Sequence, residues 1–275
     1  RIGLISTWNT KCGIAAYSKR LIDEIDEDVT VFAPVDSETI LNDGSNIVRC
    51  WEFNSSSLEN LTIKIKGETL TTIIIQFNFG FFNSNALEQL LISIHKANIV
   101  SVIIFHSTTH SENLPDKDLK NLFPVLLRCD RLLVHSIKDL NRLKNIGLVD
   151  NVTLFPQGVK NTFSNKKYQY NLNGFIHKQY WNLSTYGYCL PDKGLDILIK
   201  SMQYLRKKDY NFKLSMYNCI YNNEHKSYFN YLQALICELR LNKFVTIDGS
   251  YHSDEKVHSL LSKEDLILFP YQKSN

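Results

Sequence analysis

Residues 71–77 read Thr-Thr-Ile-Ile-Ile-Gln-Phe, and residues 100–106 read Val-Ser-Val-Ile-Ile-Phe-His. Neither stretch alternates between apolar and polar residues, as a strand with one face in water does. Continuous apolar runs of this kind are typical of strands buried on both faces, and such strands form parallel sheets covered by helices on both sides. The two stretches therefore predict an α/β fold.

Similar apolar runs, separated by helical patterns, extend outward from these stretches over the first 160 residues. We expect strands at Ile2–Ser6, Val29–Phe32, Ile47–Trp51, Thr72–Phe77, Val100–Phe105, Arg131–His135 and Val152–Phe155. We expect helices at Ile14–Ile25, Leu58–Lys66, Ala86–Lys96, Asp118–Leu127 and Ile137–Ile146. Ser136 fits an N-cap and Gly147 fits a glycine that ends a helix. The alternation predicts a Rossmann-like N-terminal domain over residues 1–160.

The alternation stops and then resumes in a second domain. Residues 161–183 are rich in Asn, Lys, Tyr and Gln and are interpreted as an interdomain linker. Beyond them we expect strands at Ser184–Tyr188, Phe212–Tyr217, Phe244–Ile247 and Leu266–Phe269, with helices at Gly194–Leu205, Tyr228–Leu239 and Glu255–Leu261. These elements predict a second Rossmann-like domain over residues 184–275. We expect it to be incomplete at its C-terminus, because its last strand is followed almost at once by Asn275.

Composition narrows the class of protein. The chain has 275 residues, of which 44% are apolar and 21% charged, and its net charge of +3 is too small to indicate nucleic-acid binding. Its six cysteines form no C-x-x-C pair, which argues against a zinc site and against a secreted disulfide scaffold. The sequence shows no signal peptide and no apolar run of bilayer length. We therefore expect a cytoplasmic protein, either soluble or bound peripherally at the inner face of the membrane.

Parallel α/β sheets bind ligands at the carboxyl ends of their strands. After the first strand, residues 6–14 (Ser-Thr-Trp-Asn-Thr-Lys-Cys-Gly-Ile) form a polar loop that leads into a helix. Gly13 would let the unpaired N–H groups of the helix start approach an anion; an ordinary turn is the alternative. The loop lacks G-x-G-x-x-G, and no G-K-[ST] occurs, so a nicotinamide dehydrogenase or a P-loop enzyme is poorly supported.

His106 follows the most apolar strand, where an imidazole could donate to a substrate oxygen or move a proton. A structural histidine is the alternative. No metal site is predicted, because the His106-x-x-x-His110 spacing has no accompanying Glu. The Asp26-Glu27-Asp28 segment is expected at the amino edge of the sheet, as a solvated turn.

Residues 186–195, Tyr-Gly-Tyr-Cys-Leu-Pro-Asp-Lys-Gly-Leu, run from a strand through a loop into a helix. Lys193 stands at the start of this helix, where the helix dipole disfavours a cation. A bound phosphate would explain this position. A surface lysine whose charge is softened by Asp192 is the alternative.

Taken in order, several segments resemble the GT-B glycosyltransferases of family 4, retaining enzymes that include many bacterial hexosyltransferases. The segments are Cys12–Tyr17, Phe105–Ser107, Phe155–Val159, Gly187–Gly194, Gly249 and Leu266–Pro270. The resemblance covers nearly the whole chain and implies two Rossmann-like domains with the active site between them. It implies transfer of a hexose from a nucleoside diphosphate sugar to a glycan or lipid-linked acceptor, as in polysaccharide biosynthesis.

The resemblance also implies roles for single residues. His106 matches the catalytic histidine near the transferred sugar. Lys193 matches the basic residue that neutralises the charge of the donor diphosphate. Gly13 matches the loop that faces the donor phosphates and the acceptor, and residues 249–251 match the segment that cradles the nucleotide base. The substrate-binding candidates are Asn9, Gly13, Tyr188, Lys193, Gly249 and Tyr251. Such enzymes typically need no metal, and the nucleotide sugar is a substrate, so no cofactor is expected.

Two positions depart from the family pattern. An arginine usually stands where this chain has Tyr188, so the diphosphate would depend more heavily on Lys193. Paired glutamates usually follow the last strand, the first near Ser274, and none occurs from Pro270 to Asn275. Two alternatives therefore stay open: a catalytically silent nucleotide- or sugar-binding module, and a nucleotide-sugar epimerase or isomerase. The latter would need a redox cofactor or a second base beside His106.

Overall fold

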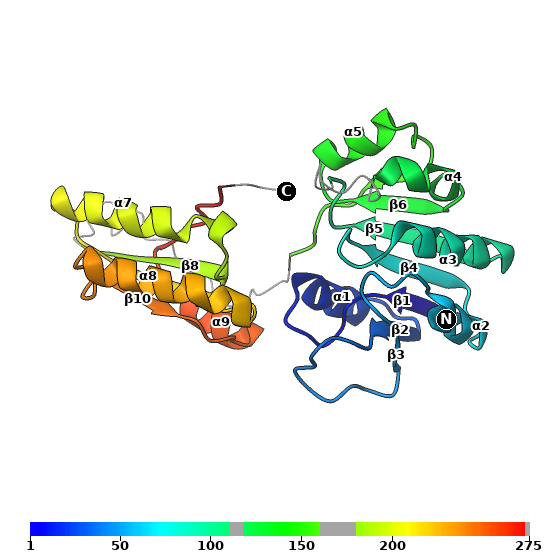
Figure 1. The fold of residues 1–275 in the computed structure, drawn as a ribbon, viewed down its shortest axis with the longest axis horizontal. Helices are drawn as coiled ribbons and strands as arrows, with labels where there is room; N and C mark the ends of the chain where they lie inside the picture. The colour runs from blue at the N-terminus through cyan, green and yellow to red at the C-terminus, as the bar shows by residue number, and fades with distance from the viewer. Residues whose placement is uncertain (110–117, 160–179, 273–275) are drawn as a thin grey trace. The chain divides into compact units, whose positions relative to one another are not determined.

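The structure, a computed structural model, describes residues 1–109, 118–159 and 180–272. The chain divides into two compact units, Arg1–Phe163 and Ser164–Asn275. Each unit is built around its own parallel β-sheet, with helices packed on the sheet (Figure 1). The predicted α/β class is therefore confirmed in both halves.

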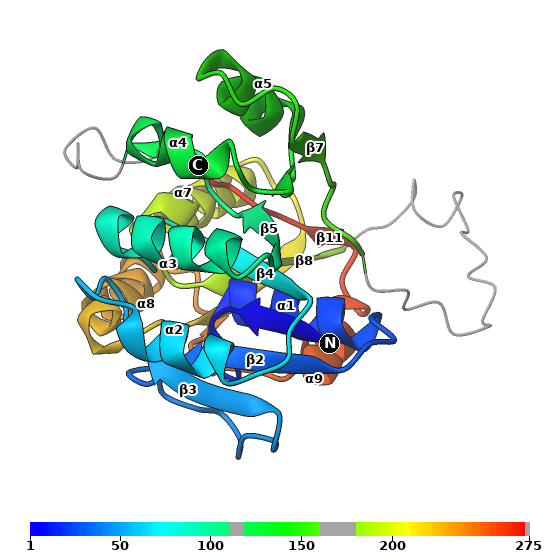
Figure 2. The same ribbon diagram turned by 90° about the vertical axis from the view of Figure 1, so that its right-hand side faces the viewer.

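The first unit contains a seven-stranded sheet in the order β3-β2-β1-β4-β5-β6-β7, and every neighbouring pair is parallel. Its strands are β1 (Ile2–Ile5), β2 (Val29–Pro34), β3 (Ile47–Trp51), β4 (Thr72–Phe77), β5 (Val100–Phe105), β6 (Arg131–Val134) and β7 (Val152–Leu154). Figure 2 shows β3 at one edge and β7 at the other. The two stretches that predicted buried strands, β4 and β5, lie inside the sheet and pair over six residues.

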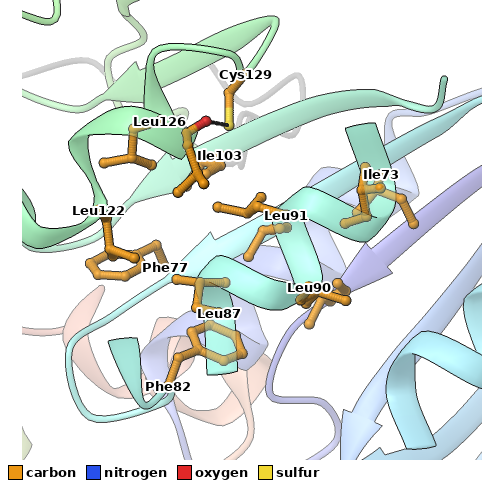
Figure 3. Close-up of a cluster of buried hydrophobic side chains, with 14 of the residues drawn as sticks. Ile73, Phe77, Phe82, Leu87, Leu90, Leu91, Ile103, Leu122, Leu126 and Cys129 are labelled. Atoms are coloured by element: carbon orange, nitrogen blue, oxygen red, sulfur yellow. Dashed lines mark hydrogen bonds between the residues drawn. The ribbon is translucent and has the colours of Figure 1, made fainter. Parts of the chain in front are cut away.

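The main core of this unit lies between the sheet and a row of helices. These are α2 (Glu59–Lys66), α3 (Ser84–Lys96), α4 (Phe123–Leu126) and α5 (Ile137–Asn145). In Figure 3, Leu91 of α3 lies near Ile103 of β5, and Leu87 of the same helix lies near Phe82, all in one buried cluster. Helix α1 (Gly13–Asp23) packs through Ile22 on a separate cluster. Leu4 belongs to that cluster and its neighbour Ile5 to the main core, so α1 and α3 cover opposite faces of the sheet.

Local signals set several element boundaries. The Ser136 hydroxyl accepts a hydrogen bond from the Asp139 N–H, and Gly147 has φ +99, so both predicted ends of α5 are confirmed. The predicted helix over Asp118–Leu127 is wrong in part. Residues Leu119–Leu122 form a 3₁₀ turn (η2) and only Phe123–Leu126 are α-helical, because Pro124 has no N–H to continue an α-helix from residue 120.

The second unit contains a four-stranded sheet in the order β10-β9-β8-β11, and its pairs are parallel. Its elements are β8 (Trp181–Tyr188), the 3₁₀ turn η3 (Pro191–Lys193), α7 (Leu195–Lys207), β9 (Phe212–Cys219), η4 (Asn223–His225), α8 (Lys226–Glu238), β10 (Val245–Asp248), α9 (Asp254–Leu261) and β11 (Leu266–Ile267). Helices α7 and α8 lie side by side on the sheet (Figure 1) and share one hydrophobic core with β8 and β9.

The predicted linker of residues 161–183 falls mostly outside the described residues. Its last three residues, however, belong to β8, which begins at Trp181 rather than at Ser184. The Trp181 N–H donates to the Asn211 carbonyl, and this bond extends the ladder between β8 and β9. Among the described residues, no helix is both long and apolar enough to cross a bilayer.

Candidate functional site

Three polar side chains meet at the carboxyl ends of neighbouring strands in the first unit. Gln76 is the next-to-last residue of β4, and His106 and His135 directly follow β5 and β6. The residue before each of them is buried in the core on the α3 side, so these three side chains face the α1 side of the sheet. The ring of Tyr17 from α1 lies 5.0 Å from that of His106 and 5.3 Å from that of His135.

His106 is held in one orientation as a neutral imidazole. Its Nε2 lies 2.6 Å from Oε1 of Gln76, and because a carbonyl oxygen only accepts, Nε2 carries the hydrogen. Burial, helped by the nearby His135, lowers the pKa of His106 to about 4. At neutral pH the ring is therefore uncharged and presents the lone pair of Nδ1. This arrangement suits hydrogen bonding to a substrate better than delivery of a proton, and the catalytic role of His106 stays a prediction.

Sequence reasoning missed Gln76 and His135 as site residues. Gln76 is fully buried, and His135 lies with its ring centroid 5.2 Å from that of His106. Two signals could have found them. Gln76 is the polar interruption in an otherwise apolar strand, and His135 occupies the same position after β6 that His106 occupies after β5.

The loop after β5 is fastened to helix α5. The Thr108 hydroxyl donates to the Asp139 carboxylate, and Nη1 of Arg142 donates to the same hydroxyl at 2.7 Å. The turn beyond His106 is therefore fixed by α5. His110, the second histidine of the spacing, lies outside the described residues.

Asn9 uses most of its side chain to bind another loop of the protein. Its amide nitrogen donates to the Leu41 carbonyl and, at 2.9 Å, to Asp43, while its amide oxygen accepts the Leu41 N–H. Asp43 in turn pairs with Arg49, which also donates to the Pro34 carbonyl. Both amide hydrogens of Asn9 are thus engaged within the protein. The geometry favours a role in fixing the loop, and substrate binding by Asn9 stays a prediction.

Gly13 begins helix α1 at an open position. Its preceding residue, Cys12, makes no side-chain cap, and the first turn contains no acid. A Cβ at Gly13 would meet nothing within 4 Å. There is therefore open space beside Gly13 at this helix start, as an anion-binding role requires, but no contact tests that role.

In the second unit, Lys193 is the last residue of the 3₁₀ turn that precedes α7. Gly194 follows as the N-cap of α7 with φ +65. The Lys193 ammonium lies 3.6 Å from the Asp192 carboxylate and 4.0 Å from the centroid of the Tyr271 ring. The cation is therefore held between a carboxylate and an aromatic face close to the helix start, so its place there has a structural explanation as well as a functional one.

The segment that follows β11 also contacts the loop that carries Lys193. The Gln272 N–H donates to the Asp192 carbonyl, and an added Cβ at Gly194 would lie 2.1 Å from the Pro270 carbonyl oxygen. Only glycine allows this approach. The segment after β11 thus fixes the loop that carries Lys193, and this contact between residues far apart in the chain could not be predicted from the sequence.

The remaining candidates of the second unit lie at the same carboxyl edge. Tyr188 ends β8 and its ring packs edge-on against Tyr221 at 5.0 Å. Gly249 follows β10, where a Cβ would come within 2.8 Å of Phe229. Its lack of a side chain therefore has a packing reason. Tyr251 is 42% exposed. The structure gathers these residues at the ends of β8 and β10, and their binding roles stay predictions.

Two other features do not belong to this edge. An apolar groove of about 270 Å³ includes Trp181 and Phe212, which begin β8 and β9, so it lies toward the opposite end of the sheet. The Asp28 carbonyl accepts the Ile2 N–H at the start of β1, so residues 26–28 lie at the amino edge as predicted. Within the described ranges, no cluster of three or more His, Cys, Asp or Glu side chains could hold a metal ion.

The fold is similar to that of several solved proteins. A sucrose-phosphate synthase from Thermosynechococcus elongatus matches 99% of this chain and 76% of its own, with 13% identity and a TM-score of 0.68. Anabaena Alr3699/HepE in complex with UDP matches 100% of this chain and 75% of its own, with 15% identity and a TM-score of 0.69. A UDP-GlcNAc 2-epimerase from Methanocaldococcus jannaschii matches 97% and 77%, with 13% identity and a TM-score of 0.57.

No protein-family model and no curated protein sequence matches the chain. At these identities the structural likeness establishes the fold and nothing finer. The expected GT-B fold, with two Rossmann-like domains, is confirmed.

Proposed function

We propose that this protein is a glycosyltransferase that moves a hexose from a nucleoside diphosphate sugar to a glycan or lipid-linked acceptor, with retention of the anomeric configuration. The observation that carries the proposal is the loop of residues 189–194, called the Lys193 loop below, which lies at the carboxyl end of β8. A cation stands there beside the start of α7, which has no side-chain cap. Both features attract a diphosphate.

The second observation that supports the proposal is that the acidic residue in the first turn of α7 is paired with other side chains. Asp196 would repel a phosphate, but its carboxylate is bonded to Lys200 at 3.0 Å and to the Tyr228 hydroxyl at 3.5 Å. Its charge is therefore already engaged by other side chains. Lys193, which directly precedes the N-cap Gly194, is thus a cation beside the start of the helix.

In the proposed reaction the first unit contributes uncharged groups. Neutral His106 would position a sugar hydroxyl or stabilise the oxocarbenium-like transition state by a hydrogen bond. The departing diphosphate itself can accept the proton of the acceptor hydroxyl, so no strong base is needed. Lys193 and the start of α7 would take the electrostatic task that a divalent ion performs elsewhere, so we propose metal-independent transfer.

A nucleotide-sugar epimerase is the second candidate. It would need a second base beside His106, and His135 stands there with its ring 5.2 Å away. One of the structurally similar proteins is a UDP-GlcNAc 2-epimerase. The two candidates differ in their products, because an epimerase returns an intact nucleotide sugar whereas a transferase releases the nucleoside diphosphate.

The test is to incubate the full chain with UDP-glucose, UDP-N-acetylglucosamine and GDP-mannose, and to follow the products by NMR. Release of nucleoside diphosphate, with the sugar appearing in the same anomeric configuration on water or an added acceptor, would support the proposal. Inversion at the anomeric carbon would refute retention. An intact nucleotide sugar with an altered hexose would favour the epimerase, and binding without any chemistry would favour the silent module.

A further inference from the structure

Among the described residues of the first unit, Nε2 of His135 is one of two imidazole nitrogens that are buried without a hydrogen-bond partner. Nδ1 of His135 lies 2.8 Å from the carbonyl oxygen of Phe155. Since that oxygen only accepts, Nδ1 carries a hydrogen, and Nε2 of the neutral ring presents a lone pair. Among the described residues and in the absence of ligand, Nε2 of His135 has no hydrogen-bond partner although it is shielded from solvent.

A buried, unpaired acceptor is unusual, because leaving it unsatisfied costs about 1–3 kcal/mol. His135 is also placed where a ligand would be expected. It directly follows a parallel strand, at the carboxyl edge of the sheet, and its ring contacts those of His106 and Tyr17. The amide nitrogen of Gln76 in the same group is likewise buried without a partner.

The chemistry of this group selects its ligand. The groups that face one another here are the rings of Tyr17, His106 and His135 and the amide of Gln76, and none of them carries a charge when both imidazoles are neutral. Two imidazole nitrogens, Nδ1 of His106 and Nε2 of His135, present lone pairs. The diphosphate of a nucleotide sugar has only acceptor oxygens at neutral pH and would face these two lone pairs with lone pairs of its own. A hydroxyl group has the hydrogen that these nitrogens lack.

We propose that Nε2 of His135 accepts a hydrogen bond from a hydroxyl group of a bound sugar, and that Gln76 and His135 together fix the His106 ring for this ligand. Gln76 does so by holding the Nε2 hydrogen of His106, and His135 does so by ring contact. The hydroxyl can come from the sugar of the donor or from that of the acceptor. The kinetic part of the test rests on the proposed function, whereas the spectroscopic part does not.

The spectroscopic test uses the wild-type chain with ¹⁵N-labelled histidine. Long-range ¹H–¹⁵N spectra should show His106 protonated at Nε2 and His135 protonated at Nδ1. The Nε2 resonance of His135 should shift on addition of UDP-glucose or GDP-mannose if the donor sugar supplies the hydroxyl. It should shift on addition of glucose or mannose to the UDP- or GDP-bound protein if the acceptor supplies it. UDP alone should not move it. No shift with any of the four sugar-containing probes would overturn the proposal.

The kinetic test compares two substitutions of the same residue. His135→Asn can keep a donor for the Phe155 carbonyl but removes the acceptor at the Nε2 position. His135→Gln restores an oxygen near that position. His135→Asn should raise KM for the sugar that supplies the hydroxyl about 3- to 10-fold, the effect of one neutral hydrogen bond, and His135→Gln should recover most of the loss. Equal losses in both variants would overturn the proposal.

A matched control is available in the same unit. His95 also has a buried, unpaired ring nitrogen, but it lies in the last turn of α3, and its other nitrogen lies 3.4 Å from Ser101 near the amino end of β5. His95→Asn should leave KM unchanged, and an equal rise in KM would overturn the proposal. A wild-type chain that shows the His135 shift but turns over no nucleotide sugar would contradict the proposed function and leave the hydroxyl site standing.

Discussion

Replacing Gly194 by alanine should weaken the second unit more than any ordinary glycine substitution. The added Cβ would lie 2.1 Å from the Pro270 carbonyl oxygen, whereas ordinary van der Waals contact begins at 3.4 Å. Residue 270 would therefore have to move by about 1.3 Å (3.4 − 2.1), and it lies three residues beyond the end of a strand of only two residues. The substitution should detach the segment that crosses the Lys193 loop.

The expected magnitude has two parts. An alanine in the left-handed region, at φ +65, costs about 1–2 kcal/mol relative to glycine. Overpacking against backbone costs about 1–3 kcal/mol. Together they predict a loss of about 2–5 kcal/mol in the free energy of unfolding of the second unit. The affinity for a nucleoside diphosphate should fall as well, because the crossing segment carries Tyr271, which packs on Lys193.

The loss of stability can be measured by urea unfolding, with hydrogen–deuterium exchange mass spectrometry as the readout. Peptic peptides from each unit then report on the unfolding of the two units separately. The midpoint for peptides of the second unit should fall, and that for the first unit should stay. Gly67→Ala is the matched control, since Gly67 has φ −75 and an added Cβ there would lie 3.5 Å from its nearest neighbour. An unchanged midpoint for Gly194→Ala would contradict the close contact between Gly194 and the Pro270 carbonyl oxygen.

Three further predictions concern the chemistry of the site. His106→Ala should cut kcat about 10–1000-fold in a nucleotide-sugar turnover assay, with little change in donor affinity, because it removes one preorganised contact of the transition state; full turnover would assign His106 to the core. Burial lowers the pKa of His106 to about 4, so between pH 6.5 and 4 the unfolded chain binds more protons than the folded one, and the wild type loses stability as the pH falls. His106→Ala removes this group, so its free energy of unfolding should depend less on pH in this range. Urea midpoints at both pH values measure this, and equal slopes in both proteins would contradict it. EDTA should leave turnover intact, and activity that is lost to chelation and restored by manganese would count against metal-independent transfer.

The sheet elements could be predicted from the sequence because their signals are local. The apolar runs of β4 and β5 and the cap residues Ser136 and Gly147 each specify the structure of their own neighbourhood. The helix expected over residues 118–127 is wrong in part for a local reason too, because Pro124 breaks the α-helical hydrogen-bond pattern there.

The site could be predicted only as a set of positions. The sequence placed His106 and Lys193 at strand ends, but it could not show that Tyr271 covers Lys193 or that the Asn9 amide is engaged by Leu41 and Asp43. Such contacts join residues that are far apart in the chain and depend on how loops cross. The unpaired nitrogen of His135 likewise cannot be predicted from the sequence, because it depends on whether a neighbouring residue donates a hydrogen bond to it in the folded structure.

The central claim, that the Lys193 loop binds the diphosphate of a nucleotide, is tested most directly by calorimetry with UDP and GDP. Loss of one charge-assisted hydrogen bond is worth about 1.5–3 kcal/mol, so Lys193→Ala should raise the Kd of the nucleotide that binds by about 10- to 150-fold. Lys207→Ala, an exposed lysine in the last turn of the same helix, should bind like the wild type. An unchanged Kd for Lys193→Ala would contradict the account.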